Sequence, residues 1–142
     1  MNVAELTKKL QTLAVKHDVL PSSIDDATLG AMLFHAASTI AVDHDVTERA
    51  ATDALTAWLD GDGVMLRYDA VELRRQLVDW QFIVRDGFGR AYRRAPAAPA
   101  RFAEVCAAAA TLDVTSLIAD ARRRDAEVRA SRKAAHLAQL AA

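Results

Sequence analysis

Residues 69–94, which read DAVELRRQLVDWQFIVRDGFGRAYRR, decide the fold. The first part of this stretch has apolar side chains at Leu73, Leu77 and Trp80, the spacing of one face of an α-helix. Asp69 stands where an N-cap is expected, and a glutamate follows three residues later, as in a capping box. We therefore predict a helix that starts after Asp69 and packs through this apolar face.

The second part of the stretch predicts a β-hairpin. Residues 82–85 and 90–93 are β-prone, and Asp86-Gly87-Phe88-Gly89 between them is a turn sequence, because glycine adopts positive φ without steric cost. A two-stranded hairpin alone is marginal in water, so we expect it to pack on the helices.

Apolar residues at helical spacing predict further helices on both sides of this stretch. They are expected at about residues 3–17, 26–42, 47–59, 100–111 and 114–140. Asp25 or Asp26 and Thr47 are the expected N-caps of the second and third helices, and Asp113 or Thr115 begins the last. The apolar stripe of the last helix thins after its middle, so this helix packs only at its start or needs a partner chain. Pairs such as Asp120 with Arg124 and Asp125 with Arg129 indicate a solvated face around its arginines.

Three helices followed by a hairpin is the order of a winged helix, with residues 69–80 in the recognition position. We expect a mainly α fold: a winged-helix-like core of three helices plus a two-stranded β-hairpin, with extra N- and C-terminal helices. The expected division is an N-terminal helix (1–23), a winged-helix-like domain (24–95), and an Ala/Pro linker with C-terminal helices (96–142). The long connection at residues 59–68 departs from the tight turn of a standard helix-turn-helix.

Composition and charge limit the classes of protein to which the chain can belong. The chain has 142 residues, a net charge of −1 and 52% hydrophobic residues, so it can bury a core but is not a uniformly basic nucleic-acid binder. Residues 1–62 carry 10 acids and 4 bases, whereas residues 63–142 carry 14 bases and 9 acids. This asymmetry has two explanations: an anionic partner for the second half, or attraction between the halves. The polar N-terminus and the lack of a long apolar run lead us to expect a cytoplasmic protein without a membrane partner.

The sequence offers no convincing catalytic or metal site. His35, within a predicted buried helix, is best interpreted as a structural histidine. Asp43-His44-Asp45 and Asp60-Gly61-Asp62-Gly63 resemble metal-binding stretches, but neither is followed by the further ligands that such a site needs. The single cysteine, Cys106, lies in an apolar context and can form no intramolecular disulfide. We therefore expect no catalytic residues, no metal, no cofactor and no enzymatic activity.

The stretch from Tyr68 to Arg94 resembles the bacterial "domain of unknown function 2087" family, and the resemblance extends weakly over about residues 28–94. The matching positions are Asp69, Leu73, Arg74, Arg75, Leu77, Val78, Asp79, Phe82, Arg85, Gly89 and Tyr92. The resemblance implies a small bacterial helical domain with a C-terminal hairpin, sometimes attached to helix-turn-helix regulators. It implies no cofactor and no catalytic residues. The matching charges also have a structural interpretation, in which Arg74 or Arg75 pairs with Asp79 and Arg85 pairs with an acid at a helix end.

If the domain binds nucleic acid, we expect the contacts at Arg75, Gln76, Arg90, Arg93 and Arg94. Arginine suits phosphate because its planar fork donates two hydrogen bonds at once. The alternative is that Arg93 and Arg94 pair with the acidic first half of the chain, at Asp43, Asp45 or Glu48.

Two functions from different classes thus remain. The first is an uncharacterised bacterial winged-helix-like protein that acts as a transcription-associated nucleic-acid-binding domain, with DNA as its partner. The second is a non-enzymatic protein-interaction or dimerisation module, in which the terminal helices contact a second copy or another protein.

Overall fold

A computed structural model describes all 142 residues and is mainly helical, as predicted. The helices are α1 (Val3–Ala14), α2 (Asp26–Ala37), α3 (Glu48–Asp60), α4 (Ala70–Asp79), α5 (Ala103–Ala110) and α6 (Val114–Ala141). The strands are β1 (Val46–Thr47), β2 (Ile83–Arg85) and β3 (Ala91–Arg94), and two short 3-10 helices are η1 (Pro21–Ser23) and η2 (Ala100–Phe102). No individual helix is long and apolar enough to cross a bilayer; η2–α5 and α6 reach that threshold only when these two segments, bent by 66°, are counted together.

Side-chain caps fix where most of the helices begin. The predicted caps Asp25, Thr47 and Asp69 each accept a hydrogen bond from the backbone N–H three residues later. Asp113 does the same for α6. α2 ends at Ala37, five residues earlier than predicted, because the hydroxyls that follow it bond back to backbone carbonyls of its last turn. α1 likewise ends at Ala14, before the predicted end at residue 17.

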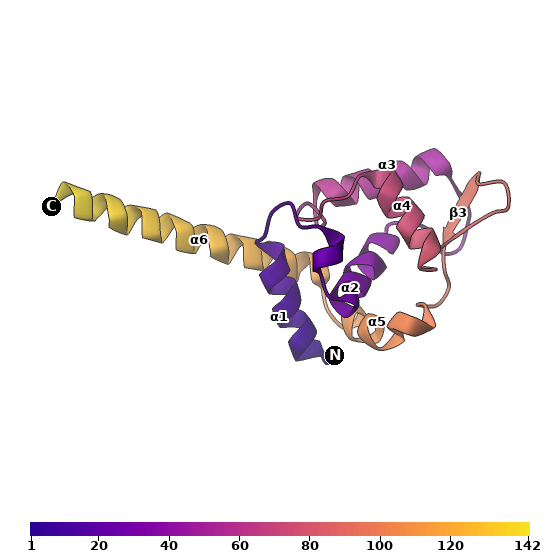
Figure 1. The fold of residues 1–142 in the computed structure, drawn as a ribbon, viewed down its shortest axis with the longest axis horizontal. Helices are drawn as coiled ribbons and strands as arrows, with labels where there is room; N and C mark the ends of the chain where they lie inside the picture. Colours follow the sequence, from indigo (N-terminus) through magenta and orange to yellow (C-terminus); the bar gives the residue numbers. More distant parts are fainter.

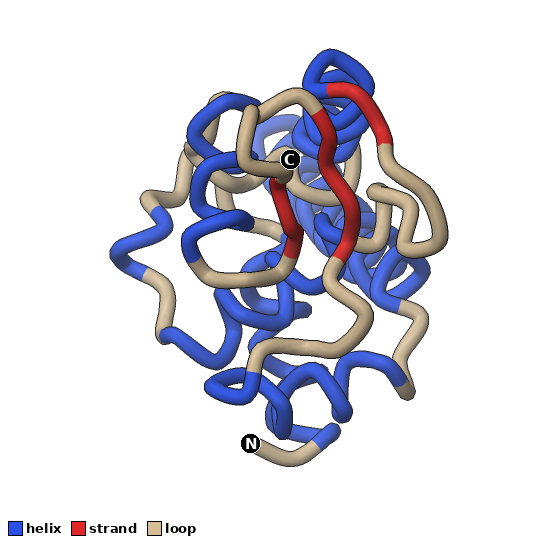
Figure 2. The backbone as a smooth tube through the Cα atoms, turned by 90° about the vertical axis from the view of Figure 1, so that its right-hand side faces the viewer, coloured by secondary structure: helices blue, strands red, loops and turns tan.

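The predicted hairpin is present, but it belongs to a three-stranded sheet. β2 and β3 pair antiparallel, with Ile83 opposite Arg94, and β1 joins the other edge of β3, with Val46 opposite Tyr92. The sheet order is therefore β1-β3-β2 (Figure 2). The third strand was missing from the sequence prediction because two residues are too few to show an alternating pattern.

The order α2, β1, α3, α4, β2, β3 confirms the winged-helix-like core. α3 and α4 pack together and the hairpin follows α4 at one end of the molecule (Figure 1). The long connection between α3 and α4 is held in place: Val19, after α1, bonds to it through Met65 O and Arg67 N–H, both at 2.8 Å. Asp18 pairs with Arg67 beside this bridge.

One hydrophobic core runs through the whole chain. Its 29 buried residues come from all six helices, from both strands of the hairpin and from the connections between them. Leu6 and Leu10 of α1, Val105 of α5 and Ile118 of α6 are all at most 4% exposed. The terminal helices therefore complete the core around the central winged-helix-like segment.

α6 is packed only over its first two turns. Val114, Ile118 and Ala121 are buried, whereas almost every side chain from Arg123 onward is exposed. The distal part of α6 extends away from the body, at the end opposite the sheet (Figure 1). Of the predicted surface pairs, Asp125 with Arg129 forms at 3.0 Å, but Asp120 pairs with Arg123 rather than with Arg124.

Arg122 anchors the base of α6. Its guanidinium donates to the carbonyls of Ala14, at the end of α1, and Gly61, after α3, at 3.1 and 3.2 Å. These bonds join α6 to two separate parts of the core.

Candidate nucleic-acid interface

α4 and the hairpin flank a hollow of about 330 Å³. Its walls come from the start of α3, from α4, from both strands and from the turn between them. The lining residues are Glu48, Arg74, Arg75, Val78, Asp79, Arg85, Phe88, Gly89 and Tyr92.

The predicted apolar face of α4 sets which side of the helix reaches this hollow. Leu73 and Leu77 are fully buried, as predicted, and Trp80 is half-buried. Trp80 stacks on Phe102 with ring centroids 5.1 Å apart, and the guanidinium of Arg101 lies over the Trp80 ring, 4.7 Å from its centroid. With these side chains inside, the opposite side of α4 faces solvent and the wing.

The two consecutive arginines of α4 have opposite surroundings. Arg74 is buried: it donates to the Thr52 hydroxyl at 2.7 Å, pairs with Glu48 at 3.3 Å and lies 5.4 Å from the centre of the Tyr92 ring. Arg75 is exposed and makes no hydrogen bond or ion pair. The sequence interpretation that one of them pairs with Asp79 is therefore wrong.

Gln76, the second predicted contact on α4, is engaged inside the fold. Its side-chain oxygen accepts a hydrogen bond from the hydroxyl of Tyr68, and the residue is half-buried. Burial raises the pKa of Tyr68 to about 12, so this hydroxyl stays protonated and keeps donating. Only the amide NH₂ of Gln76 is left for another partner.

The three predicted arginines at positions 90–94 have different surroundings, and Arg90 lies just before β3 rather than in it. Arg90 is exposed and its side chain has no partner. Arg93 donates to Asp45 at 3.0 Å, so the alternative pairing with the acidic first half is what this residue adopts. Arg94 is half-buried, its Nε lacks a hydrogen-bond partner, and it lines a different, largely apolar cavity beside α5. Neighbouring residues of a strand point to opposite faces, which explains why the two last arginines diverge.

Arg85 completes the hollow and was absent from the predicted contacts. It lies on β2, opposite Tyr92, exposed and without an ion pair, although the sequence interpretation assigned it to an acid at a helix end. No sequence pattern identifies Arg85, because β2 has only three residues and their burial (buried, exposed, exposed) does not alternate.

The turn at the tip of the hairpin is internally bonded. Oδ1 of Asp86 accepts hydrogen bonds from the N–H groups of Phe88 and Arg90, at 3.1 and 2.9 Å. These bonds lower the pKa of Asp86, and the bond from the Arg90 amide has the largest effect. Gly89 has φ +68°, which favours glycine there. Phe88 is left 86% exposed at the tip.

The surface around the hollow carries both signs of charge. Arg75, Arg85 and Arg90 are free cations, while Glu72 and Asp79 are exposed acids on α4 itself. Any phosphate contact here relies on individual arginines, because there is no broad positive field.

A second polar cluster joins α2, α3 and the start of α6. Trp58 donates to Nδ1 of His35 at 2.9 Å, and Nε2 of His35 lies 3.3 Å from the Thr115 hydroxyl, which donates to Asp62 at 2.6 Å. The Trp58 bond places the proton of neutral His35 on Nε2, so the ring has no lone pair to take a proton from Thr115. Burial lowers the pKa of His35 and favours this neutral form. The cluster therefore connects helices rather than activating a nucleophile.

The comparisons with known proteins identify one family. Residues 21–94, just over half of the chain, match the family described as "Uncharacterized protein conserved in bacteria (DUF2087)". This match confirms the resemblance seen in the sequence. It begins at η1, seven residues before the expected start at residue 28. No curated protein and no solved structure matches the chain.

Proposed function

Because the chain belongs to the bacterial DUF2087 family, whose segment here forms the winged-helix-like core, we propose that it binds duplex DNA through α4 and the β2–β3 wing. In winged-helix proteins the helix before the hairpin enters a groove and the hairpin contacts the backbone. α4 and the hairpin hold these positions in the present fold.

The observation that carries the proposal is that two unpaired arginines, Arg75 and Arg85, line one hollow, and a third, Arg90, follows the turn that forms part of its wall. Arg75 comes from α4, Arg85 from β2, and Arg90 precedes β3 at the end of the turn. Most other arginines of the chain are held by acids or by backbone carbonyls within the fold. Free arginines beside a recognition helix are suited to phosphate oxygens, which each guanidinium can contact with two donors.

The exposed acids of α4 limit how strong this binding is. Glu72 and Asp79 flank Arg75 and repel phosphates, so we expect weak, salt-sensitive affinity. With three phosphates neutralised, the logarithm of the affinity should fall with the logarithm of salt at a slope of about −2.7.

Fluorescence anisotropy of a labelled random-sequence duplex, titrated at several salt concentrations, tests the proposal. The triple variant R75Q/R85Q/R90Q should lose binding and melt at an unchanged temperature, because none of the three side chains has an internal partner. The matched control R124Q/R129Q/R132Q removes the same charge from distal α6, at the opposite end of the molecule (Figure 1). The proposal fails if the parent protein shows no binding, or if the α6 variant weakens it as much as the wing variant does.

A second candidate function is self-association through distal α6, in which a second copy covers the exposed helix. It is favoured by the exposed Leu137 and Leu140, at 54% and 70%, on the part of α6 that extends away from the body. Sedimentation equilibrium should then show a dimer that L137D/L140D converts to a monomer. A monomeric parent protein at high concentration excludes this candidate.

A further inference from the structure

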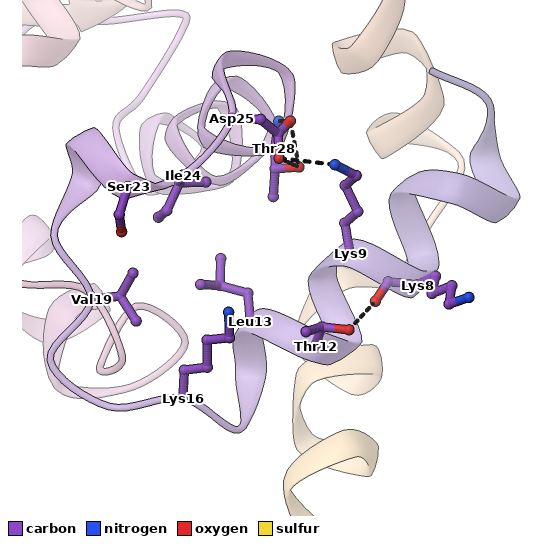
Figure 3. A pocket seen from close by; sticks show the side chains of 10 residues that line it. All are labelled: Lys8, Lys9, Thr12, Leu13, Lys16, Val19, Ser23, Ile24, Asp25 and Thr28. Carbon is purple, nitrogen blue, oxygen red and sulfur yellow. Dashed lines mark hydrogen bonds and ion pairs between the residues drawn. The ribbon is translucent and has the colours of Figure 1, made fainter.

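A cavity of about 460 Å³ lies between α1 and the segment that leads into α2 (Figure 3). It shares no residue with the α4–wing hollow. Its lining combines basic, hydroxyl and apolar side chains: Lys8, Lys9, Thr12, Leu13, Lys16, Val19, Ser23, Ile24, Asp25 and Thr28. This volume is in the range of pockets that hold small organic molecules.

Lysine is concentrated at this cavity. Of the 18 lysines and arginines in the chain only four are lysines; Lys8, Lys9 and Lys16 line the cavity and Lys133 lies on distal α6. The same three residues are three of the four bases in residues 1–62, a segment with 10 acids. Positive charge is therefore gathered here within the acidic half of the protein.

Pairing inside the fold does not account for this gathering. Asp25 is the one acid in the lining; it bonds Lys9 at 3.2 Å and accepts from the backbone and hydroxyl of Thr28 as the cap of α2. Lys16 makes no ion pair, and its side chain reaches in beside Leu13, whereas Lys8 turns away from the cavity (Figure 3). The free cation that faces the cavity is thus Lys16.

The hydroxyl groups in the wall are already donating. Thr12 donates to the carbonyl of Lys8 at 3.0 Å, and Ser23 donates to the carbonyl of Leu20 at 2.7 Å. A ligand with several anionic groups would find too few donors, so one anionic group beside Lys16 fits best.

The remaining wall is apolar. Leu13 is 5% exposed, and Val19 and Ile24 are half-buried around the same space. An inorganic anion would leave these side chains in water, while an apolar body would cover them.

We propose that this cavity binds a small organic anion with an apolar body. Its carboxylate or phosphate lies beside Nζ of Lys16 and its body contacts Leu13, Val19 and Ile24. Because the two walls belong to α1 and to the start of α2, the bound ligand joins the N-terminal helix to the DUF2087 segment.

Titrations of the full chain, followed by backbone amide chemical shifts, test this site. The probes are naphthoate, naphthyl phosphate, naphthalenemethanol as the neutral counterpart, and inorganic phosphate. Naphthoate or naphthyl phosphate should saturate with shifts at Leu13, Val19 and Ile24, and the tighter of the two identifies the preferred anionic group. The other two probes should bind at least about tenfold more weakly, since each lacks the charge or the apolar body.

The variant K16Q removes the proposed contact, and K133Q is its matched control. Lys16 is exposed and unpaired, so K16Q should fold normally and weaken the anionic probe about tenfold or more, while K133Q leaves it unchanged. The proposal is overturned if the neutral probe binds equally well, if inorganic phosphate alone reproduces the affinity and the shifts, if K133Q acts like K16Q, or if no probe shifts these amides. A DNA titration reports on amides of α4 and the wing, so failure of either site leaves the other testable.

Discussion

Replacing Arg74 by alanine should destabilise the protein strongly, whereas the same change at Arg75 should not. The two residues are adjacent on α4, so the gain in helix propensity from alanine is the same for both and cancels in the comparison. What differs is the surroundings: Arg74 is 9% exposed and bonded on three sides, and Arg75 is exposed and free.

The size of the effect follows from the contacts of Arg74. Its charged hydrogen bond to Thr52 contributes about 1.5–3 kcal/mol. Its position over the Tyr92 ring adds about 0.5–1 kcal/mol. Glu48 is 53% exposed, so solvent screening limits that ion pair to about 1 kcal/mol at most. We therefore expect R74A to lower the free energy of unfolding by about 2–5 kcal/mol and R75A to change it by less than about 0.5 kcal/mol.

Urea denaturation of the two variants, followed by far-UV circular dichroism, measures this difference. R74M is an informative third variant: it keeps an apolar stem of similar length, so it should recover part of the loss by packing against Tyr92. Equal midpoints for R74A and R75A would show that Arg74 does not connect α4 to α3 and β3.

Four further outcomes can be measured by urea denaturation or amide exchange. Leu77→Ala should cost about 2–5 kcal/mol, because Leu77 is fully buried between α4 and the core, and an unchanged urea midpoint would contradict this. Gly89→Val should strain the hairpin turn, where φ is +68°, and reduce amide protection in residues 83–94; unchanged protection would rule out a role for this φ. Gln81→Gly should raise stability by about 0.5–1 kcal/mol, since Gln81 has φ +68° after α4, and a loss of stability would show that its side chain matters more than its backbone. Burial lowers the pKa of His35 below its ordinary 6.5, so at acidic pH the unfolded chain binds a proton that the folded protein does not. Stability should therefore be full above pH 6.5 and fall as the pH drops below it. The same pH dependence in His35→Gln would assign that loss to other groups.

The helices and their caps could be predicted from the sequence because both are local. Asp69 caps its own helix, and Leu73 and Leu77 share a face by spacing alone. β1 could not be predicted, since Val46 and Thr47 become a strand only by pairing with β3, far along the chain. The end of α2 depended on hydroxyls bonding back to the helix, which competes with continuation in a way that periodicity does not reveal.

The candidate contacts were predicted less completely because tertiary geometry decides whether an arginine is buried, paired or free. Arg74 and Arg75 are identical and adjacent in sequence, yet one is buried and the other free. Arg93 pairs with Asp45, which lies 48 residues earlier in the sequence. Arg85 was overlooked because the sequence offered acids for it to pair with, and only the folded arrangement shows that none does.

The way α6 is anchored affects how its distal turns form. Starting a helix in water is the unfavourable step, because several residues are ordered for the first hydrogen bond, whereas each later residue adds a bond of its own. The turns packed around Ile118 and Ala121 are already ordered by the core, so the residues beyond them need only propagate the helix. Distal α6 therefore has a ready-made nucleus, and its alanine-rich sequence can remain helical in solvent, with a helix population that declines with distance from Ala121.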